Sequence, residues 1–356
     1  MKNSFMEKNL KNVEWSEFEI GDLFKIENCK CSNVSLLQNG NIPYIGATNR
    51  NNGVLKFVKP VEKLITKGNC IAFICDGEGS VGYSIYKAED FIGSTTVKTG
   101  RSKNLNKYTG HFITTIADTV RSKYSFGFKR NEVHLKKEKI LLPATPQGEP
   151  DYAFMDEFMK EIEQRKLKKY RDYLVKRINH VKDFKPVPSI KEKDWGEFYI
   201  NEIFTDIQRG SRLKKDDHKK GNMPYVSSTA MNNGVDSFVG NKDQIRIFNN
   251  CLTIANSGSV GATFYQPFSF VASDHITKLA NENFNEFIYI FISNITKRVS
   301  EKYSFNREIN DQRIKKEKIL LPINNQSQPD YQYMENYIKK IEYDKLTKYL
   351  NLKLKF

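Results

Sequence analysis

The loop Asp76-Gly77-Glu78 holds the neighbouring carboxylates best placed for chemistry in this sequence. Two carboxylates beside a lysine can hold Mg²⁺ and direct a water molecule at a phosphodiester bond. A related segment later in the chain, however, has Ala255, Asn256 and Ser257 at the aligned positions. An intrinsic magnesium-dependent nuclease is therefore kept only as an alternative.

Thiols are a second possible source of chemistry. Zinc is compatible with the spacings Cys-x-Cys and Cys-x4-Cys, and the five cysteines are Cys29, Cys31, Cys70, Cys75 and Cys251. Aligning the related segments places Ile254 opposite Cys75 and Ala72 opposite Cys251. Because apolar residues commonly take the place of buried structural thiols, the sequence favours structural cysteines and no metal site.

Side chains suited to recognising planar partners occur in the segment IPYIGATNRNNGV, residues 42–54. Arg can form paired hydrogen bonds with guanine, and Asn can do the same with adenine. The segment MPYVSSTAMNNGV, residues 223–235, keeps the frame but replaces Asn49 and Arg50 by Ala230 and Met231. A plain polar turn is the alternative. The candidate base-reading residues are Thr48, Asn49, Arg50, Asn51, Thr229 and Asn232.

Basic residues beside aromatic residues suit contacts with phosphate groups. Such residues lie in SKYSFGFKR and EKYSFNRE, and a further basic patch lies in QRGSRLKKDD. The candidate phosphate contacts are Lys123, Lys129, Arg130, Lys302 and Arg307, with Arg209, Arg212, Lys214 and Lys215 in the patch.

These segments belong to a tandem duplication. GSVG at 79–82 returns at 258–261, a shift of 258 − 79 = 179, and KKEKILLP at 136–143 returns unchanged at 315–322 with the same shift. The period far exceeds that of solenoid repeats. Each copy should therefore form a domain with its own core.

Composition agrees with two domains and a polyanionic partner. The chain has 356 residues, of which 39% are hydrophobic, and 57 Lys and Arg against 42 Asp and Glu give a net charge of +15. A lysine-rich surface that is merely solvated is the alternative, since net charge does not specify a partner. No apolar run approaches the roughly 18 residues of a membrane span. We expect a cytoplasmic protein.

Each copy divides into a β-rich region and a long helix. Runs such as CIAFICDGEGSVGYSIY predict strand, glycine turn and strand, so this region should be a compact α/β domain. Asp151 and Asp330 are placed to cap the helices that follow. The predicted boundaries are 1–149 and 195–328 for the domains, 150–180 and 329–356 for the helices, and 181–194 for a linker.

Apolar residues recur at helical spacing along both helices. The repeated stripe predicts that the two helices pair with each other as an antiparallel, coiled-coil-like rod. Packing of each helix only on its own domain is the alternative. The predicted interface residues are Met155, Ile162, Tyr170, Leu174, Met334, Ile341 and Tyr349.

Both copies contain the same motifs in the same order: an aromatic opener, IPYIGATNRNNGV, GEGSVG, KKEKILLP, PDYAFM and a basic helix, as written in the first copy. This duplicated order resembles the DNA specificity subunits of type I restriction-modification systems. The helices are short for that family, and their style is similar to the specificity subunits of type IIB restriction enzymes. The resemblance implies two pseudo-symmetric α/β target recognition domains, joined by two antiparallel helices and reading a bipartite site in double-stranded DNA.

The resemblance also implies partners. DNA methyltransferase subunits would dock on the helices and carry S-adenosylmethionine and Mg²⁺, and a restriction or motor subunit is a further candidate partner. This chain lacks the motifs NPPY and FxGxG, and its GSVG segments precede strand-like sequence instead of the helix that a phosphate cradle needs. We expect a non-catalytic subunit, with a phage-defence scaffold as a further alternative.

Overall fold

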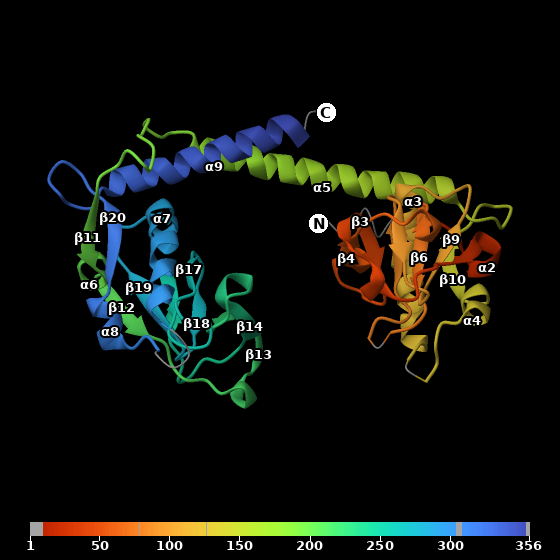
Figure 1. Ribbon diagram of the computed structural model, residues 1–356, viewed down its shortest axis with the longest axis horizontal. Helices are drawn as coiled ribbons and strands as arrows, with labels where there is room; N and C mark the ends of the chain where they lie inside the picture. The colour runs from red at the N-terminus through yellow and green to blue at the C-terminus, as the bar shows by residue number, and fades with distance from the viewer. Residues whose placement is uncertain (1–9, 78, 126, 304–307, 354–356) are drawn as a thin grey trace. The chain divides into compact units, whose positions relative to one another are not determined.

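The computed structural model describes residues 10–77, 79–125, 127–303 and 308–353 (Figure 1). The chain forms two compact units, Met1–Lys169 and Tyr170–Phe356. In its described part no helix is long and apolar enough to cross a membrane.

The strands described in the first unit form three sheets. The small sheet pairs β1 (Trp15–Glu19) with β10 (Lys139–Pro143). An antiparallel sheet has the order β2 (Lys25–Asn28), β9 (Val97–Arg101), β6 (Cys70–Ile74) and β7 (Ser84–Lys87). The third sheet has the order β4 (Val54–Val58), β3 (Asn39–Ile45), β8 (Phe91–Gly93) and β5 (Ile65–Thr66). In this sheet β3 and β8 are parallel.

The second unit repeats this topology sheet by sheet. Its small sheet pairs β11 (Trp195–Tyr199) with β20 (Lys318–Pro322). The next has the order β12 (Asp206–Arg209), β19 (Ile276–Ala280), β16 (Cys251–Ala255) and β17 (Thr263–Gln266). The last has the order β14 (Val235–Val239), β13 (Lys220–Val226), β18 (Phe270–Ala272) and β15 (Ile247–Phe248). The predicted duplication of an α/β domain is confirmed.

The helices are repeated as well. The first copy has α2 (Ile20–Leu23), α3 (Lys107–Ala117), α4 (Glu132–Lys136) and α5 (Tyr152–Val181). The second copy has α6 (Ile200–Ile203), α7 (Glu286–Thr296), α8 (Asp311–Lys316) and α9 (Tyr331–Lys353). Short 3₁₀ turns connect them, namely η1 (Val34–Leu36), η2 (Asn51–Gly53), η3 (Glu62–Leu64), η4 (Asp118–Lys123), η5 (Lys215–Asp217), η6 (Asn232–Gly234) and η7 (Lys297–Lys302).

Aspartate side chains begin both long helices, as predicted. Oδ1 of Asp151 accepts a hydrogen bond from the backbone N–H of Phe154 at 2.9 Å, and Oδ1 of Asp330 accepts one from Tyr333 at 2.9 Å. Each carboxylate satisfies an N–H group that the first helical turn leaves without a partner. The repeated Pro-Asp pair is therefore a helix start.

The first turns of α5 and α9 belong to the domain cores. Met155 is fully buried in the core that α3 forms with β6 and β10, and Ile162 packs at its edge. Met334 is fully buried in the corresponding core of the second unit. The prediction that Met155 and Met334 lie at a helix or subunit interface is therefore wrong, because each side chain is enclosed by its own domain.

Within the second unit, the end of α5 packs against α9 in the predicted antiparallel sense. The rings of Tyr170 and Tyr349 meet with centroids 5.8 Å apart, and Arg177 contacts Glu342. The partner's number falls as the number along α5 rises, which is the register of antiparallel helices (Figure 1). The chain between the helices follows α9, where the backbone N–H of Lys185 donates to Asn336 at 3.1 Å.

Candidate nucleic-acid interface

The repeated Asn-Asn-Gly triplet is a left-handed corner in both units. The φ angles are +48°, +53° and +78° for Asn51, Asn52 and Gly53, and +48°, +55° and +80° for residues 232–234. Asn and Gly are the residues that adopt this region at least cost. A Cβ on Gly53 would also lie 2.9 Å from the side chain of Ile85. The repeated Asn-Asn-Gly residues therefore specify the backbone conformation of this corner.

This corner closes a loop that we call the reading loop, residues 46–53 in the first unit and 227–234 in the second. The backbone N–H of Gly46 donates to Gly53 at 3.2 Å, and that of Ser227 donates to Gly234 at 3.0 Å. Each loop is thus a closed unit anchored on the end of β3 or β13.

A threonine inside each reading loop holds the backbone at the positions whose residues differ between the two copies. Oγ1 of Thr48 accepts a hydrogen bond from the backbone N–H of Arg50 at 3.1 Å, and Oγ1 of Thr229 accepts one from Met231 at 3.1 Å. Asn49 and Arg50 are exposed, and Met231 is 70% exposed. The same frame therefore presents an Asn-Arg pair in one domain and an Ala-Met pair in the other.

The GSVG segments are turns, as predicted, and glycines in or just before them pack on the reading loops. A Cβ on Gly77, two residues before the first GSVG, would lie 2.5 Å from Cβ of Ala47, and a Cβ on Gly258, the first glycine of the second GSVG, would lie 2.6 Å from Oγ of Ser228. In the second unit the backbone N–H of Ser259 also donates to Ser228 at 3.0 Å. We call residues 76–77 with 79–82, and residues 255–261, the glycine turns.

The 3₁₀ turn that follows α3 or α7 lies on the other side of each glycine turn. A Cβ on Gly82 would lie 2.8 Å from Cβ of Arg121, and a Cβ on Gly261 would lie 2.5 Å from Cβ of Ser300. Both glycines have positive φ angles, +93° and +80°. Reading loop, glycine turn and η4 or η7 therefore form one packed assembly in each domain.

The basic residues predicted to contact phosphate groups in the first domain differ in whether they are already paired. Lys123 is exposed at the end of η4. Lys129 is also exposed, but its Nζ lies 2.7 Å from Oδ2 of Asp76. The hydrogen bond from Lys129 lowers the pKa of the Asp76 carboxyl. The carboxylate considered for Mg²⁺ is thus paired with a lysine.

Arg130 cannot contact a phosphate group, which corrects that prediction. Its side chain is fully buried, its Nε donates to Glu138 at 2.8 Å, and its Nη1 donates to the carbonyl of Gly82 at 3.0 Å and to Ser84 at 3.1 Å. The SKYSFGFKR motif gave no sign of burial, because the partner groups come from distant segments. Arg130 instead ties the glycine turn to Glu138, which directly precedes β10.

The second-domain basic residues surround β12 and η5. Nε of Arg209 donates to the carbonyl of Asp274, whereas Arg212, Lys214 and Lys215 are exposed. Lys302 is exposed and its Nζ lies 3.1 Å from Glu317. Arg307 falls outside the described residues.

A polar cluster that sequence reasoning missed lies beside the second reading loop. The Ser257 hydroxyl is 2.6 Å from Nδ1 of His275, whose Nε2 is 3.8 Å from Asp274. The first copy has Thr96 at the position of His275, since 275 − 179 = 96. No sequence signal links these residues, because Ser257 and His275 are 18 positions apart with β17 and β18 between them.

The predicted helix-interface residues of the second unit divide into buried and exposed positions. Leu174 is buried, whereas Tyr170 and Tyr349 are 42% and 43% exposed. Ile341 lines an apolar hollow of about 460 Å³ together with Tyr337 and Ile338. Exposed aromatic rings and this hollow leave apolar surface on the helix pair.

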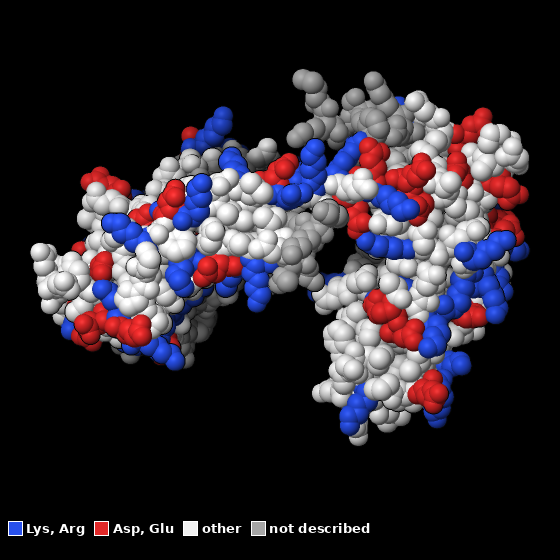
Figure 2. All heavy atoms as spheres, turned by 90° about the horizontal axis from the view of Figure 1, so that it is seen from above, with Lys and Arg blue, Asp and Glu red and all other residues white. Residues whose placement is uncertain are grey.

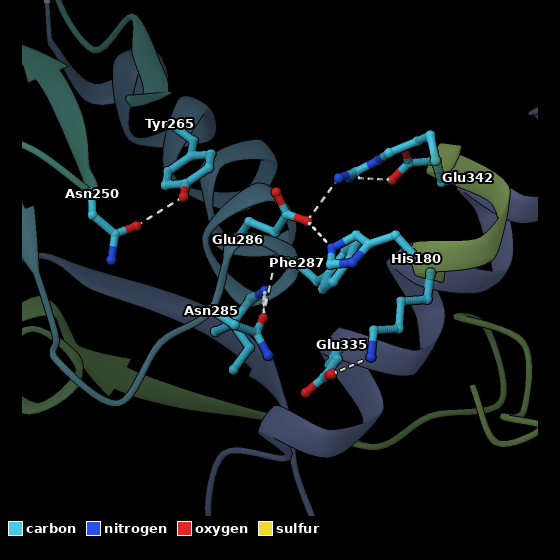
Figure 3. Close-up of polar contacts among 11 residues, drawn as sticks. His180, Asn250, Tyr265, Asn285, Glu286, Phe287, Glu335 and Glu342 are labelled. Carbon is cyan, nitrogen blue, oxygen red and sulfur yellow. Dashed lines mark hydrogen bonds and ion pairs between the residues drawn. The ribbon is translucent and has the colours of Figure 1, made fainter. Parts of the chain in front are cut away.

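Arg177 joins three helices at one end of this surface. Its guanidinium contacts Glu342 on α9 and lies 2.9 Å from Glu286 on α7, whose carboxylate also lies 2.9 Å from Nε2 of His180 (Figure 3). Sequence reasoning missed this bridge, because its partners lie 109 and 165 residues away.

The last features of the site are the distribution of its charged side chains and the state of its cysteines. On the face that Figure 2 presents, basic and acidic side chains are interspersed and form no single patch. All five cysteines are buried, and burial raises the pKa of Cys29 to about 11 and that of Cys70 to about 12. The described residues contain no group of three or more His, Cys, Asp and Glu able to hold a metal ion.

Comparison with known proteins yields a family and a fold. Residues 12–169 and 192–354 each match the family described as type I restriction modification DNA specificity domain. The chain is 28% identical over 334 residues, 93% of this chain and 95% of the relative, to the type II restriction enzyme BgcI specificity subunit S.BcgI from Heyndrickxia coagulans. The S subunit of a type I restriction-modification system from M. genitalium has the same fold, with a TM-score of 0.59 over 96% of this chain and 92% of that chain at 15% identity.

Proposed function

Because the chain belongs to the family of type I restriction-modification DNA specificity subunits and carries the family's domain twice, we propose that each domain reads one half of a bipartite duplex site. The reading loops 46–53 and 227–234 would enter the major groove, where base edges are distinguishable. The glycine turns and the 3₁₀ turns would hold the loops in place.

One observation carries this proposal. The two reading loops share their closing hydrogen bond, their threonine cap and their left-handed corner, yet differ in the two exposed residues that the frame holds. A loop that served only to connect strands would need no such separation of fixed and variable positions. Arg50 would contact guanine, and Asn49 would contact adenine, in the first half-site.

Phosphate contacts would supply affinity without selecting sequence. Lys123 in the first domain and Arg212, Lys214 and Lys215 in the second are exposed and suit this role. Lys129 and Lys302 suit it as well, provided that each exchanges its carboxylate partner for a phosphate group.

The chain itself would perform no reaction. Asp76 is paired with Lys129, and its aligned residue in the second copy is Ala255, so the acidic loop offers no repeated metal site. S-adenosylmethionine and Mg²⁺ would be bound by methyltransferase subunits and by a nuclease or motor subunit. Those subunits would dock on the helix pair, where Tyr170, Tyr349 and the hollow beside Ile341 leave apolar surface in a chain otherwise rich in charge.

Selection from random duplex DNA tests the proposal. The full chain, co-purified with a DNA methyltransferase subunit, should enrich two short half-sites separated by a spacer of fixed length. Replacing Tyr170 and Tyr349 by Glu should reduce co-purification, whereas replacing both by Phe should not. One continuous enriched site, or no enriched site, would contradict a bipartite reader.

A further inference from the structure

A hollow lies beside the second reading loop. It measures about 480 Å³. Its lining residues are Ala230 of the reading loop, residues 259–261 of the glycine turn, Ala262, Phe264 of β17, and Lys297 and Ser300 of η7. Its position shows which side chains converge next to the variable residues of a reading loop.

The repeat assigns first-domain residues to the same positions. Ala262 corresponds to Tyr83, since 262 − 179 = 83, and Ser300 corresponds to Arg121, since 300 − 179 = 121. The packing supports this alignment, because Arg121 and Ser300 each cover the last glycine of a glycine turn. Two small residues in the second domain thus correspond to a tyrosine and an arginine in the first.

Tyr83 and Arg121 form a cation–π pair. The guanidinium carbon of Arg121 lies 4.5 Å from the centroid of the Tyr83 ring, and Arg121 is an exposed residue. The nearby carboxylate of Asp118 accepts a hydrogen bond from the backbone N–H of Ser84 at 2.8 Å. Contact with a ring face takes up no hydrogen-bond acceptor, so the guanidinium N–H groups that point away from the ring remain able to donate to a ligand.

The surroundings favour a base as that ligand. The ring contact restricts the motion of the Arg121 guanidinium, which lowers the entropy lost when it forms two parallel hydrogen bonds. Guanine presents O6 and N7 as the matching pair of acceptors in the major groove. Arg121 also belongs to the assembly that supports Asn49 and Arg50, whereas Arg130, nine residues further on, is buried.

We propose that the Tyr83–Arg121 pair is a second base-reading element of the first domain and that it selects guanine beside the base read by the reading loop. This inference rests on the proposed function. The second domain lacks both side chains, so its half-site should carry no guanine preference at the equivalent position.

The test is selection from random duplex DNA with the full chain and its co-purified methyltransferase subunit. Arg121→Ala should reduce the preference for guanine at one position of the first half-site by roughly 10- to 100-fold. Arg121→Lys, which keeps the charge but not the planar fork, should lose most of the same preference. Tyr83→Phe keeps the aromatic ring and should leave the preference intact, whereas Tyr83→Ala should weaken it.

The second half-site is the internal control, because it should be enriched unchanged by every one of these variants. A loss that is equal for all sequences would assign Arg121 to phosphate and overturn the inference. An unchanged first half-site in Arg121→Ala and Arg121→Lys would overturn it as well. Absence of any bipartite site for the wild-type chain would instead reject the proposed function, on which the inference depends.

A graft provides the converse test. The double substitution Ala262→Tyr with Ser300→Arg should place the cation–π pair in the hollow of the second domain. A new guanine preference in the second half-site would support the inference. A second half-site unchanged in sequence, in a variant that retains the first half-site, would count against it.

Discussion

The two domains have the same fold, but different ion pairs join their helices at equivalent positions. In the first domain Glu163 on α5 contacts Lys107 on α3 directly, and the hydroxyl of Tyr108 donates to Glu163 at 2.7 Å. In the second domain the corresponding residues are Glu342 and Glu286, which are both acidic, and Arg177 bridges them. The second domain therefore needs a cation supplied by the helix of the first copy.

The glutamate of KKEKILLP gives a second contrast. Glu138 binds the buried Arg130, whereas Glu317 in the second copy binds Lys302, and Ile309 stands where the first copy has Arg130. Differences between the copies are therefore of two kinds. Those at exposed positions of the reading loops change what a ligand meets, and those at buried positions change how the domain is held together.

The largest change in stability should follow the removal of Arg130 from the first domain. Arg130→Ala leaves Glu138 buried without its guanidinium, which should destabilise the first domain by about 3–5 kcal/mol. The neighbouring Lys129→Ala breaks only the half-exposed ion pair with Asp76 and should cost about 0–1 kcal/mol. Urea unfolding of the full chain measures both, with Trp15 as the fluorescent reporter in a Trp195→Phe background. Equal stability of the two variants would show that the buried pair contributes little.

Arg177→Ala should destabilise the second domain by about 1.5–3 kcal/mol, since two carboxylates lose their charged hydrogen-bond donor. The matched variant in the first domain is Lys107→Ala, which breaks a largely exposed pair and should cost less than about 1 kcal/mol. Trp195 in a Trp15→Phe background reports on the second domain. If Lys107→Ala were the more harmful variant, the helix bridge would not be what distinguishes the domains.

Arg50→Ala should weaken binding to the preferred site by about 1–3 kcal/mol and relax specificity at one position of the first half-site. Met231→Ala, at the equivalent position of the second reading loop, removes no hydrogen bond and should cost less. Titration of duplexes varied one base at a time makes the comparison. A loss from Arg50→Ala that is the same for every duplex would reduce the reading loop to a backbone contact.

The sequence alone predicts much of the fold, and the contacts that it does not predict are missed for a physical reason. The repeated segments predict the two domains, the helix caps and the antiparallel helices, because these depend on local residue type and on the spacing of apolar residues. The left-handed corner at Asn-Asn-Gly is not predicted, since the sequence indicates only a plain polar turn there. Burial does not follow from local residue type, so the sequence predicts Arg130 at a phosphate contact and Met155 and Met334 at an interface, whereas the structure buries all three within their own domains. The pairs of Tyr83 with Arg121 and Arg177 with Glu342 join distant segments, and no local pattern records such contacts.

The smallest effect should come from Asp76. Its folded pKa is lowered by Lys129, so the pair contributes stability above the unfolded pKa of the carboxyl and loses it as the pH falls through the folded pKa. Both side chains are about half exposed, at 43% for Asp76 and 54% for Lys129, so solvent screening should limit the contribution to about 0–1 kcal/mol. Asp76→Asn should therefore reduce stability only slightly at pH 7, and the difference from wild type should vanish under acidic conditions. Mg²⁺-dependent cleavage of DNA by the purified chain, abolished in Asp76→Asn, would instead make the first domain an enzyme and the second, with Ala255, its inactive copy.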